Sequence, residues 1–159
     1  MKVGVPKEIK VHEYRVGLTP ESVREYVHHG HEVLVQTQAG AAIGAGDDAY
    51  RQAGATVLAD ARAVYDAAEL IVKVKEPQAA EIAMLRPRHL LFTYLHLAPD
   101  PQLARGLLES GCTAIAYETV AESDGTLPLL APMSEVAGRL SITIAGQLLM
   151  RDAGGAGLL

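Results

Sequence analysis

Short apolar runs recur along the chain, and stretches with helical periodicity separate them. Runs rich in Val, Leu and Ile are typical of strands that lie inside a parallel sheet. When strands and helices alternate along a chain, the strands are usually parallel and joined by right-handed crossovers. The pattern therefore predicts an α/β fold with a flavodoxin-like, doubly wound and mainly parallel sheet, followed by a long connecting helix. The expected strands are residues 3–5, 32–35, 56–58, 70–74, 90–95 and 113–117.

Residues with special backbone preferences mark the ends of the predicted helices. Thr19 can cap a first helix that has Pro20 at its first position, and Gly30 follows the end of this helix. The other expected boundaries are Asp47 or Asp48 as the cap of a second helix, Gly54 near its end, and residues 99–110 as a third helix closed by Gly111.

The chain changes character after Ser123. Asp124 and Gly125 form a turn signal, and a long helix is expected to begin at Ser134. This helix is apolar over most of its circumference, so it must pack on both sides, as a connector or an oligomer surface does. A glycine-rich loop over residues 154–157 follows, and this ending indicates the front part of a longer protein.

Composition and charge narrow the classes of partner. The formal net charge is -5 and no dense cluster of Lys and Arg occurs, which argues against a nucleic-acid or anionic membrane surface. No apolar run approaches the ~20 residues of a membrane span. The single cysteine, Cys112, suits a reducing compartment and a small buried apolar position. We therefore expect a cytoplasmic protein that acts on a small molecule, with neither nucleic acid nor membrane as its partner.

The segment LIVKVKEP, residues 70–77, places two lysines on a strand that is otherwise apolar. Lys73 and Lys75 are two positions apart and therefore share one face of an extended strand. A lysine ammonium is rarely buried without a partner. At least one of the two must therefore lie where the strand emerges into a crevice.

Ligands of open α/β sheets bind outside the carboxyl ends of the strands. Lys75 ends one predicted strand, His96 ends the next, and the loop after the first strand leads to Arg15. A guanidinium can bind a carboxylate through two hydrogen bonds, an ammonium can polarise a carbonyl, and an imidazole titrates near neutral pH. The three groups suit a 2-oxo or 2-amino acid, with Arg15 and Lys75 on its carboxylate and carbonyl oxygens and His96 as the general acid and base.

Each of these side chains also has a structural alternative. The alternatives are a pairing of Lys73 and Lys75 with Glu69 and Glu76 at the rim of the sheet, a core position for His96, and a surface ion pair for Arg15. The cluster of His28, His29 and His31 suggests a metal site, but it falls at a helix C-terminus, where cations complement the macrodipole. We therefore expect no metal. The glycines of residues 154–157 form no G-x-G-x-x-G motif and give no nucleotide site of their own.

Six segments occur in a characteristic order: MKVGVPKEIK, YRVGLTPESV, LIVKVKEP, LLFTYLHLA, IAYETV and GTLPLLAPMSEVAGRL. In order and spacing they resemble the N-terminal part of alanine dehydrogenase, from Met1 to about Leu140. The α subunits of nicotinamide nucleotide transhydrogenase share the opening and the LPLL-type connector only loosely, and they lack counterparts of the KEP and YLH segments. The resemblance therefore favours the alanine dehydrogenase family.

The resemblance implies oxidative deamination of L-alanine to pyruvate and ammonia, with NAD as the cofactor that takes the hydride. It implies that Arg15 and Lys75 hold the substrate carboxylate and oxo group and that His96 is the general acid and base. It also implies that Met133 lies against the substrate and that Ser134 binds on the nicotinamide side of the cleft. Members of the family are dimers or hexamers, so a homo-oligomer is expected.

The resemblance implies a division into two parts as well. Residues 1–130 are expected to form a substrate-binding α/β domain, and residues 131–159 a connector helix and the start of a missing dinucleotide-binding domain. Such a chain is expected not to turn over alone, because hydride transfer needs a nicotinamide held against the substrate. Two other functions stay open: a stand-alone 2-oxo acid binding module, and a partner subunit related to the transhydrogenase α subunit.

Overall fold

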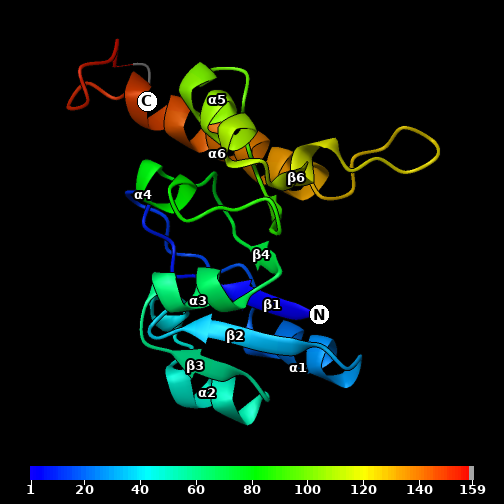
Figure 1. Ribbon diagram of the computed structural model, residues 1–159. Coiled ribbons are helices and arrows are strands. Elements are labelled where there is room, and N and C mark those ends of the chain that lie inside the picture. The colour runs from blue at the N-terminus through cyan, green and yellow to red at the C-terminus, as the bar shows by residue number, and fades with distance from the viewer. Residues whose placement is uncertain (158–159) are drawn as a thin grey trace. The chain divides into compact units, whose positions relative to one another are not determined.

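The computed structural model describes residues 1–157, which form two compact units. The first unit is Met1–Tyr117 and contains a six-stranded sheet. The second unit begins at Glu118 and contains the long helix α6, Ala131–Leu149. Figure 1 labels the elements of both units. Each unit is described by itself below.

All strand pairs of the described sheet are parallel. The strand order is β3-β2-β1-β4-β5-β6, and Figure 1 shows β3, β2, β1 and β4 following one another. The predicted α/β class, with its parallel sheet and final long helix, is confirmed. Within this class the order differs from the 2-1-3-4-5 order of flavodoxin, because periodicity along the chain does not encode which strands become neighbours. The strands are β1 Lys2–Val5, β2 Glu32–Gln36, β3 Thr56–Leu58, β4 Leu70–Val72, β5 Leu90–Thr93 and β6 Thr113–Ala116.

Helices connect the strands, and several begin and end where the sequence indicates. The Thr19 side chain accepts a hydrogen bond from the Ser22 N–H at the start of α1, as predicted. Asp60 and Asp100 cap α3 and α5 in the same way, and Gly111 closes α5 in the left-handed conformation. The helices are α1 Pro20–His28, α2 Asp47–Gln52, α3 Ala61–Ala67, α4 Ala79–Ile82 and α5 Pro101–Ser110, with 3₁₀ turns at Ala41–Ile43 and Tyr117–Thr119.

The start of α2 differs from the prediction. Gly46, and neither Asp47 nor Asp48, is the residue that precedes the helix. The Asp47 carboxylate instead accepts hydrogen bonds from Thr37 Oγ1 at 2.6 Å and from Gln38 N at 2.7 Å, so it closes the turn after β2. Helices α3 and α4 were not predicted, because with 7 and 4 residues they are too short to show a helical period.

The apolar core covers both faces of the sheet. Val33 and Val35 belong to one buried cluster and Leu34 to a second one. Alternate residues of a strand point to opposite faces, so the two clusters lie on opposite sides of the sheet. Val23 of α1 adds to the first cluster and Tyr65 of α3 to the second. A sheet that is buried on both faces explains the nearly continuous apolar runs in the sequence.

Helix α6 begins at Ala131, earlier than the predicted start at Ser134. Large apolar side chains along it, such as Val136, Leu140 and Ile144, are exposed. Among residues 1–157, no helix combines the length and the apolar character that a membrane span requires. The role of α6 as a connector or an oligomer surface stays a prediction.

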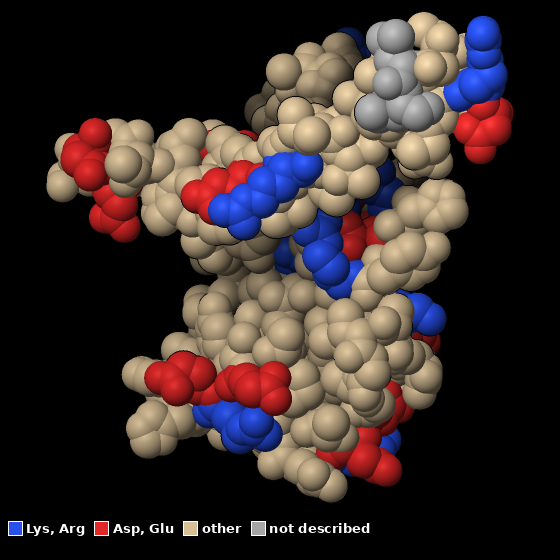
Figure 2. Space-filling model, turned by 180° about the vertical axis from the view of Figure 1, so that it is seen from behind, with Lys and Arg blue, Asp and Glu red and all other residues tan. Residues whose placement is uncertain are grey.

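Charged side chains are interspersed on the surface, and red and blue groups lie next to each other in Figure 2. Neighbours on one helix form ion pairs, such as Arg24 with Glu21 on α1 and Arg51 with Asp48 on α2. Exposed pairs of this kind contribute only about 0 to 1 kcal/mol each. The buried charges at the end of β4 are of a different kind.

Candidate active site

The carboxyl ends of β1 and β4 lie side by side, because these two strands pair in parallel. The sheet also changes its direction of growth at β1, since β2 and β3 extend it on one side and β4 follows on the other. Open α/β sheets bind their ligands in the crevice at such a switch point. Residues 6–19 after β1 and residues 73–75 after β4 therefore form the candidate site.

The Lys73 side chain is completely buried at this point, with 0% of its surface exposed. Its Nζ lies 3.0 Å from Glu8 Oε2 and 2.6 Å from Glu81 Oε1, and both glutamate side chains are 2% exposed. Two carboxylates thus share one ammonium in the interior. The cluster joins three separate pieces of the chain: the loop after β1, the end of β4 and helix α4.

The burial of this cluster changes the pKa of Glu81. Burial raises the pKa of Glu81, and the Lys73 ammonium opposes the effect without cancelling it, while the nearby Glu8 adds to it. The second oxygen of Glu81 accepts a hydrogen bond from Gln78 N at 2.8 Å and so caps α4. The carboxylate is therefore fixed by both the lysine and the helix.

The rim pairing proposed as an alternative for Lys73 is wrong. The Glu69 side chain accepts a hydrogen bond from Lys2 N at 2.7 Å, and Glu76 pairs with Lys10. The true partners of Lys73 lie far from it in the sequence or on a helix too short to predict. No sequence pattern marked Glu8, which lies in a loop where acidic residues are common.

Lys75 is half-buried, and its backbone is held on both sides. Its N–H donates to Glu8 Oε1 at 3.4 Å, and its carbonyl oxygen accepts from Thr93 Oγ1 at 2.9 Å. Among residues 1–157, the Lys75 ammonium forms no ion pair with a carboxylate. The rim alternative therefore does not describe Lys75 either, and its positive charge acts on Glu13 of the candidate site.

Arg15 is bound to Glu13 through two parallel hydrogen bonds. Nε donates to Oε1 at 2.8 Å and Nη2 to Oε2 at 2.6 Å, and the Arg15 N–H also donates to Oε1 at 2.9 Å. The pKa of Glu13 is lowered to about 2, mainly by the hydrogen bonds from Arg15 and to a smaller extent by the positive charge of Lys75. The predicted alternative of an ion pair for Arg15 is thus confirmed. Arg15 and Lys75 both lower the pKa of the Glu13 carboxylate, so the structure brings these two cations to one site.

A cavity of ≈ 300 Å³ opens beside this pair. Its polar lining comes from Lys7, Glu8, Glu13, Tyr14, Arg15 and Gln38. Small-molecule sites in proteins begin at about this volume. The cavity therefore has room for a ligand of a few heavy atoms next to the Arg15 guanidinium.

His96 lies at the neighbouring strand end. It follows β5, whose chain runs beside the end of β4, since Tyr94 N donates to Val74 O at 3.3 Å. His96 is exposed and has a left-handed backbone with φ of 49°, a conformation that few residues other than glycine adopt. Such backbones cluster at functional sites. The alternative of a core histidine is wrong for this residue.

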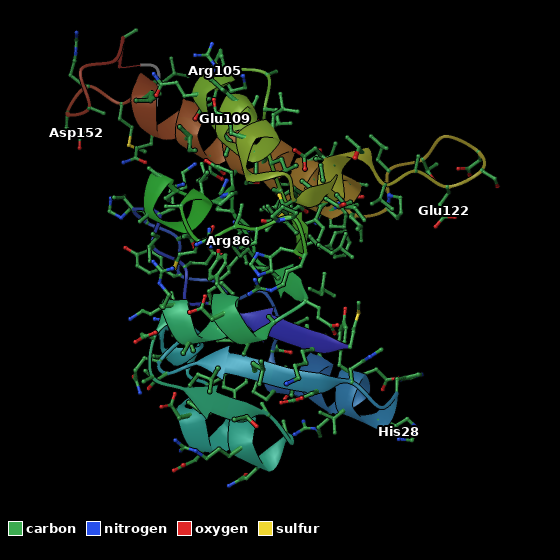
Figure 3. The ribbon with its side chains drawn as sticks, viewed as in Figure 1. His28, Arg86, Arg105, Glu109, Glu122 and Asp152 are labelled. Atoms are coloured by element: carbon green, nitrogen blue, oxygen red, sulfur yellow. The ribbon has the colours of Figure 1, made fainter. Side chains whose placement is uncertain are left out.

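The core histidine of the described chain is His89. Its Nδ1 accepts a hydrogen bond from the Arg86 N–H at 3.0 Å, so its Nε2 is the donor to Tyr65 O at 2.8 Å. Burial lowers the pKa of His89. Arg86 is labelled in Figure 3 at the turn before this residue.

Met133 and Ser134 lie near the start of α6, in the second unit. Met133 is 38% exposed and Ser134 is exposed. Their roles against the substrate and the nicotinamide stay predictions.

The three histidines near the end of α1 make different contacts, and the rings of His28 and His29 lie edge to face at a centroid distance of 5.5 Å. His29 Nδ1 lies 2.9 Å from Glu25 O, His31 Nδ1 lies 3.4 Å from the N-terminal amine of Met1, and His28 points outward (Figure 3). Within the described residues, no group of three His, Cys, Asp or Glu side chains is arranged to hold a metal ion.

The described residues do not fit the pyrophosphate of NAD. Dinucleotide-binding folds hold this group on a short glycine-rich turn between the first strand and the first helix. Here the connection spans residues 6–19 and has Gly17 as its single glycine. The position of a Cβ on Gly17 lies 2.5 Å from Val72 O, so this glycine is packed against β4. Residues 1–157 therefore supply no phosphate cradle at this turn.

The pKa of Glu13 predicts how stability changes in acid. Its folded-state pKa of about 2 lies below its ordinary value of 4.5, so its contribution is present above pH 4.5 and is lost as the pH falls towards 2. Replacing Glu13 by glutamine is expected to cost about 1 to 2 kcal/mol at pH 7, because a charged hydrogen-bonded pair is lost. Urea unfolding at several pH values should show this cost shrinking between pH 4.5 and pH 2.

A matched control for this experiment is Glu32→Gln. Glu32 is an exposed carboxylate that lies 3.6 Å from Lys2 Nζ. Its replacement is expected to change stability by less than about 0.5 kcal/mol. An acid dependence that is the same in the Glu13 variant and in the parent chain would contradict the assignment of the Arg15 pair.

A family model described as alanine dehydrogenase/PNT, N-terminal domain, matches residues 4–137. The chain belongs to this family. The resemblance found in the sequence is thereby confirmed, and the alanine dehydrogenase/PNT N-terminal domain is the framework for the site described above.

Curated relatives and solved structures that resemble this chain also support its membership of the family. The alanine dehydrogenases of Halomonas elongata and Bacillus subtilis are 55% and 53% identical over all 159 residues, which span 43% and 42% of those proteins. A solved L-alanine dehydrogenase has a TM-score of 0.89 and 51% identity, covering 100% of this chain and 44% of that one. A transhydrogenase from Sinorhizobium meliloti has a TM-score of 0.70 and 29% identity, covering 74% of this chain and 35% of that one. The chain therefore spans less than half the length of the relatives it matches.

Proposed function

We propose that this chain is the substrate-binding half of an NAD-dependent L-alanine dehydrogenase, and that it binds pyruvate and L-alanine. The observation that carries the proposal is the Lys75 ammonium, which lies at the switch point of the sheet and forms no ion pair among residues 1–157. A lysine held in this way has a charge that a ligand can satisfy. The names of the alanine dehydrogenase relatives support alanine as that ligand, and pyruvate is the 2-oxo acid that oxidation of alanine would give.

The charges around the cavity suit an anion. Arg15 and Lys75 are positive and act on Glu13, whose pKa is held at about 2. Lys7 adds a further positive charge to the lining of the cavity, while Glu8 shares the buried Lys73 with Glu81. A substrate carboxylate at this cavity therefore meets a positively charged surrounding.

Each of the three predicted groups has a chemical role in the proposed reaction. The Arg15 guanidinium and the Lys75 ammonium hold the substrate carboxylate and polarise its oxo group. His96 moves the proton at the oxygen of the reacting carbon as the general acid and base. In the complete enzyme, L-alanine, NAD⁺ and water would give pyruvate, ammonium, NADH and a proton, and NAD⁺ would supply the hydride acceptor. This chain alone is proposed to bind substrate without turnover.

A pyruvate titration followed by NMR tests the binding role. The unsubstituted chain is expected to show saturable shifts of the His96 ring signals and of the amides of residues 73–75. Lys75→Ala is expected to weaken the binding about tenfold or more, because one charged hydrogen bond is lost. Lys2→Ala is the matched control, since Lys2 is an exposed lysine at the opposite end of β1, and it should bind as the parent chain does. No shift at high pyruvate concentration would overturn the proposed function.

A second function has one observation in its favour. The transhydrogenase from Sinorhizobium meliloti shares the fold over 74% of this chain, which fits a partner subunit or a stand-alone 2-oxo acid binding module. Both functions predict pyruvate binding, and both predict no NADH when L-alanine and NAD are added to this chain alone. Addition of a separately produced NAD-binding domain of an alanine dehydrogenase separates them. Recovery of NADH formation is expected for the substrate-binding half, and its absence would favour the binding module.

A further inference from the structure

The backbone at Lys75 is held by buried side chains. The N–H groups of Val74 and Lys75 both donate to Glu8 Oε1, at 2.6 Å and 3.4 Å. The Lys75 carbonyl oxygen accepts from Thr93 Oγ1 at 2.9 Å. Counted over the whole residue, Glu8 is 8% exposed and Thr93 is 0% exposed. Strand β4 has already ended at Val72, so these side chains fix the segment beyond the last strand residue.

The carboxylate of Glu8 is itself fixed. Its second oxygen, Oε2, lies 3.0 Å from the buried Lys73 Nζ, which also binds Glu81 at 2.6 Å. The Tyr117 hydroxyl donates to the Lys73 carbonyl oxygen at 2.9 Å and holds the same segment from another side. Glu8 therefore has one orientation, in which one oxygen serves the ammonium and the other serves two backbone amides.

Glu8 connects the two sides of the switch-point crevice. It belongs to the loop after β1, which also carries Arg15, and it lines the same cavity as Arg15. Its bonds to Val74 and Lys75 tie this loop to the segment after β4. The spacing between the loop that carries Arg15 and the segment that carries Lys75 thus depends on the Glu8 carboxylate.

We propose that Glu8 is a positioning residue for Lys75, and that Lys73 is the counter-ion that holds Glu8 in place. Glu8 acts through the backbone of Lys75 and fixes the direction from which the ammonium approaches the oxo group of a 2-oxo acid. Lys73 takes no part in substrate binding, although it shares a sequence segment with Lys75. The role given to Lys75 rests on the proposed function.

A double-mutant cycle with pyruvate as the ligand tests this role. Glu8→Ala is expected to raise the dissociation constant for pyruvate about tenfold in the parent chain and less than about twofold in the Lys75→Ala background. Glu8→Gln keeps an oxygen that can accept from both amides but loses the charge that Lys73 holds, so it is expected to recover only part of the affinity. A residue that only stabilises the fold would change the affinity equally in both backgrounds, and that result would overturn the proposal.

Amide NMR provides a readout that does not depend on pyruvate. In Glu8→Ala the amide signals of Val74 and Lys75 are expected to move upfield, because they lose a carboxylate acceptor. Glu69→Gln is the matched control, since Glu69 also accepts a backbone N–H but at the other end of β4, and it should leave both signals in place. Unchanged Val74 and Lys75 amides in Glu8→Ala would overturn the positioning role.

The two possible failures are distinguishable. If the unsubstituted chain does not bind pyruvate, the proposed function fails, and the amide signals alone decide the role of Glu8. If Glu8→Ala does not fold, Glu8→Asp replaces it, because the shorter side chain keeps the charge beside Lys73 and withdraws the carboxylate from the amides. Glu8→Asp is then expected to show the same loss of affinity and the same coupling to Lys75.

Discussion

Replacing Lys73 by methionine is expected to lower the free energy of unfolding by about 3 to 5 kcal/mol. The substitution removes the ammonium that pairs with both Glu8 and Glu81, whose side chains are 2% exposed. A buried carboxylate without its partner is strongly destabilising. For a chain of this size the loss corresponds to a decrease of the melting temperature by about 10 °C. Thermal and urea unfolding of the variant and the parent chain measure it.

The pH dependence of the same variant has a definite sign. The pKa of Glu81 is already raised by burial, and Lys73 opposes the rise more strongly than the hydrogen bond from Gln78 N does. Without Lys73 the folded-state pKa rises further, so folding favours the protonated carboxyl. The variant should therefore lose stability relative to the parent chain as the pH rises, and the difference should be smallest in mild acid.

A triple variant shows that the cost comes from unpaired charge. Lys73→Met together with Glu8→Gln and Glu81→Gln removes all three charges and keeps oxygens that can accept from the surrounding N–H groups. Neutral replacements of buried ion clusters are often close to neutral in stability. We expect the triple variant to recover most of the loss. Lys2→Met, an exposed lysine, should change stability by less than about 1 kcal/mol. A triple variant that is no more stable than Lys73→Met would contradict this account.

The strands of the sheet could be predicted from the sequence, because a buried strand is recognised from a short run of neighbouring residues. Apolar runs such as residues 70–74 identify buried strands, and Thr19 and Gly111 mark helix ends by their own backbone and side-chain chemistry. The strand order was beyond this kind of argument, because it depends on which distant runs become neighbours. The short helices α3 and α4 were missed since neither is long enough to repeat an apolar face.

The candidate site was predictable only where one residue type carries the chemistry. Lys75 could be proposed because an ammonium at a strand end demands a partner, and Arg15 because a guanidinium suits a carboxylate. Glu13 and Glu8 gave no such signal. Each of them acts by a contact with a specific neighbour, and in the case of Glu8 that neighbour is 65 positions away. The alternative partners considered for Lys73 are wrong for the same reason, since Glu8 and Glu81 reach it only in the folded chain.

Ligands that contain one or both polar groups of pyruvate are expected to separate the roles of Arg15 and Lys75. Propionate has the carboxylate without the oxo group. If Arg15 binds the carboxylate, Arg15→Ala should weaken pyruvate and propionate alike, by about 10- to 100-fold, because a two-point charged pair is lost. If Lys75 polarises the oxo group, Lys75→Ala should weaken pyruvate by a similar factor and change propionate by less than about threefold.

The binding expected of Arg15 depends on the planar shape of its guanidinium as well as on its charge. Arg15→Lys keeps the positive charge but loses the planar fork that now makes two parallel bonds to Glu13. Arg15→Lys should therefore recover little of the affinity that Arg15→Ala loses. Lys75→Arg should disturb the contact with the oxo group more than the contact with the carboxylate. NMR titrations of the parent chain and the variants with both ligands give the full comparison, with Lys2→Ala as the control. Equal losses for pyruvate and propionate in Lys75→Ala would show that Lys75 binds the carboxylate, and the assignment of the oxo group to Lys75 would then be withdrawn.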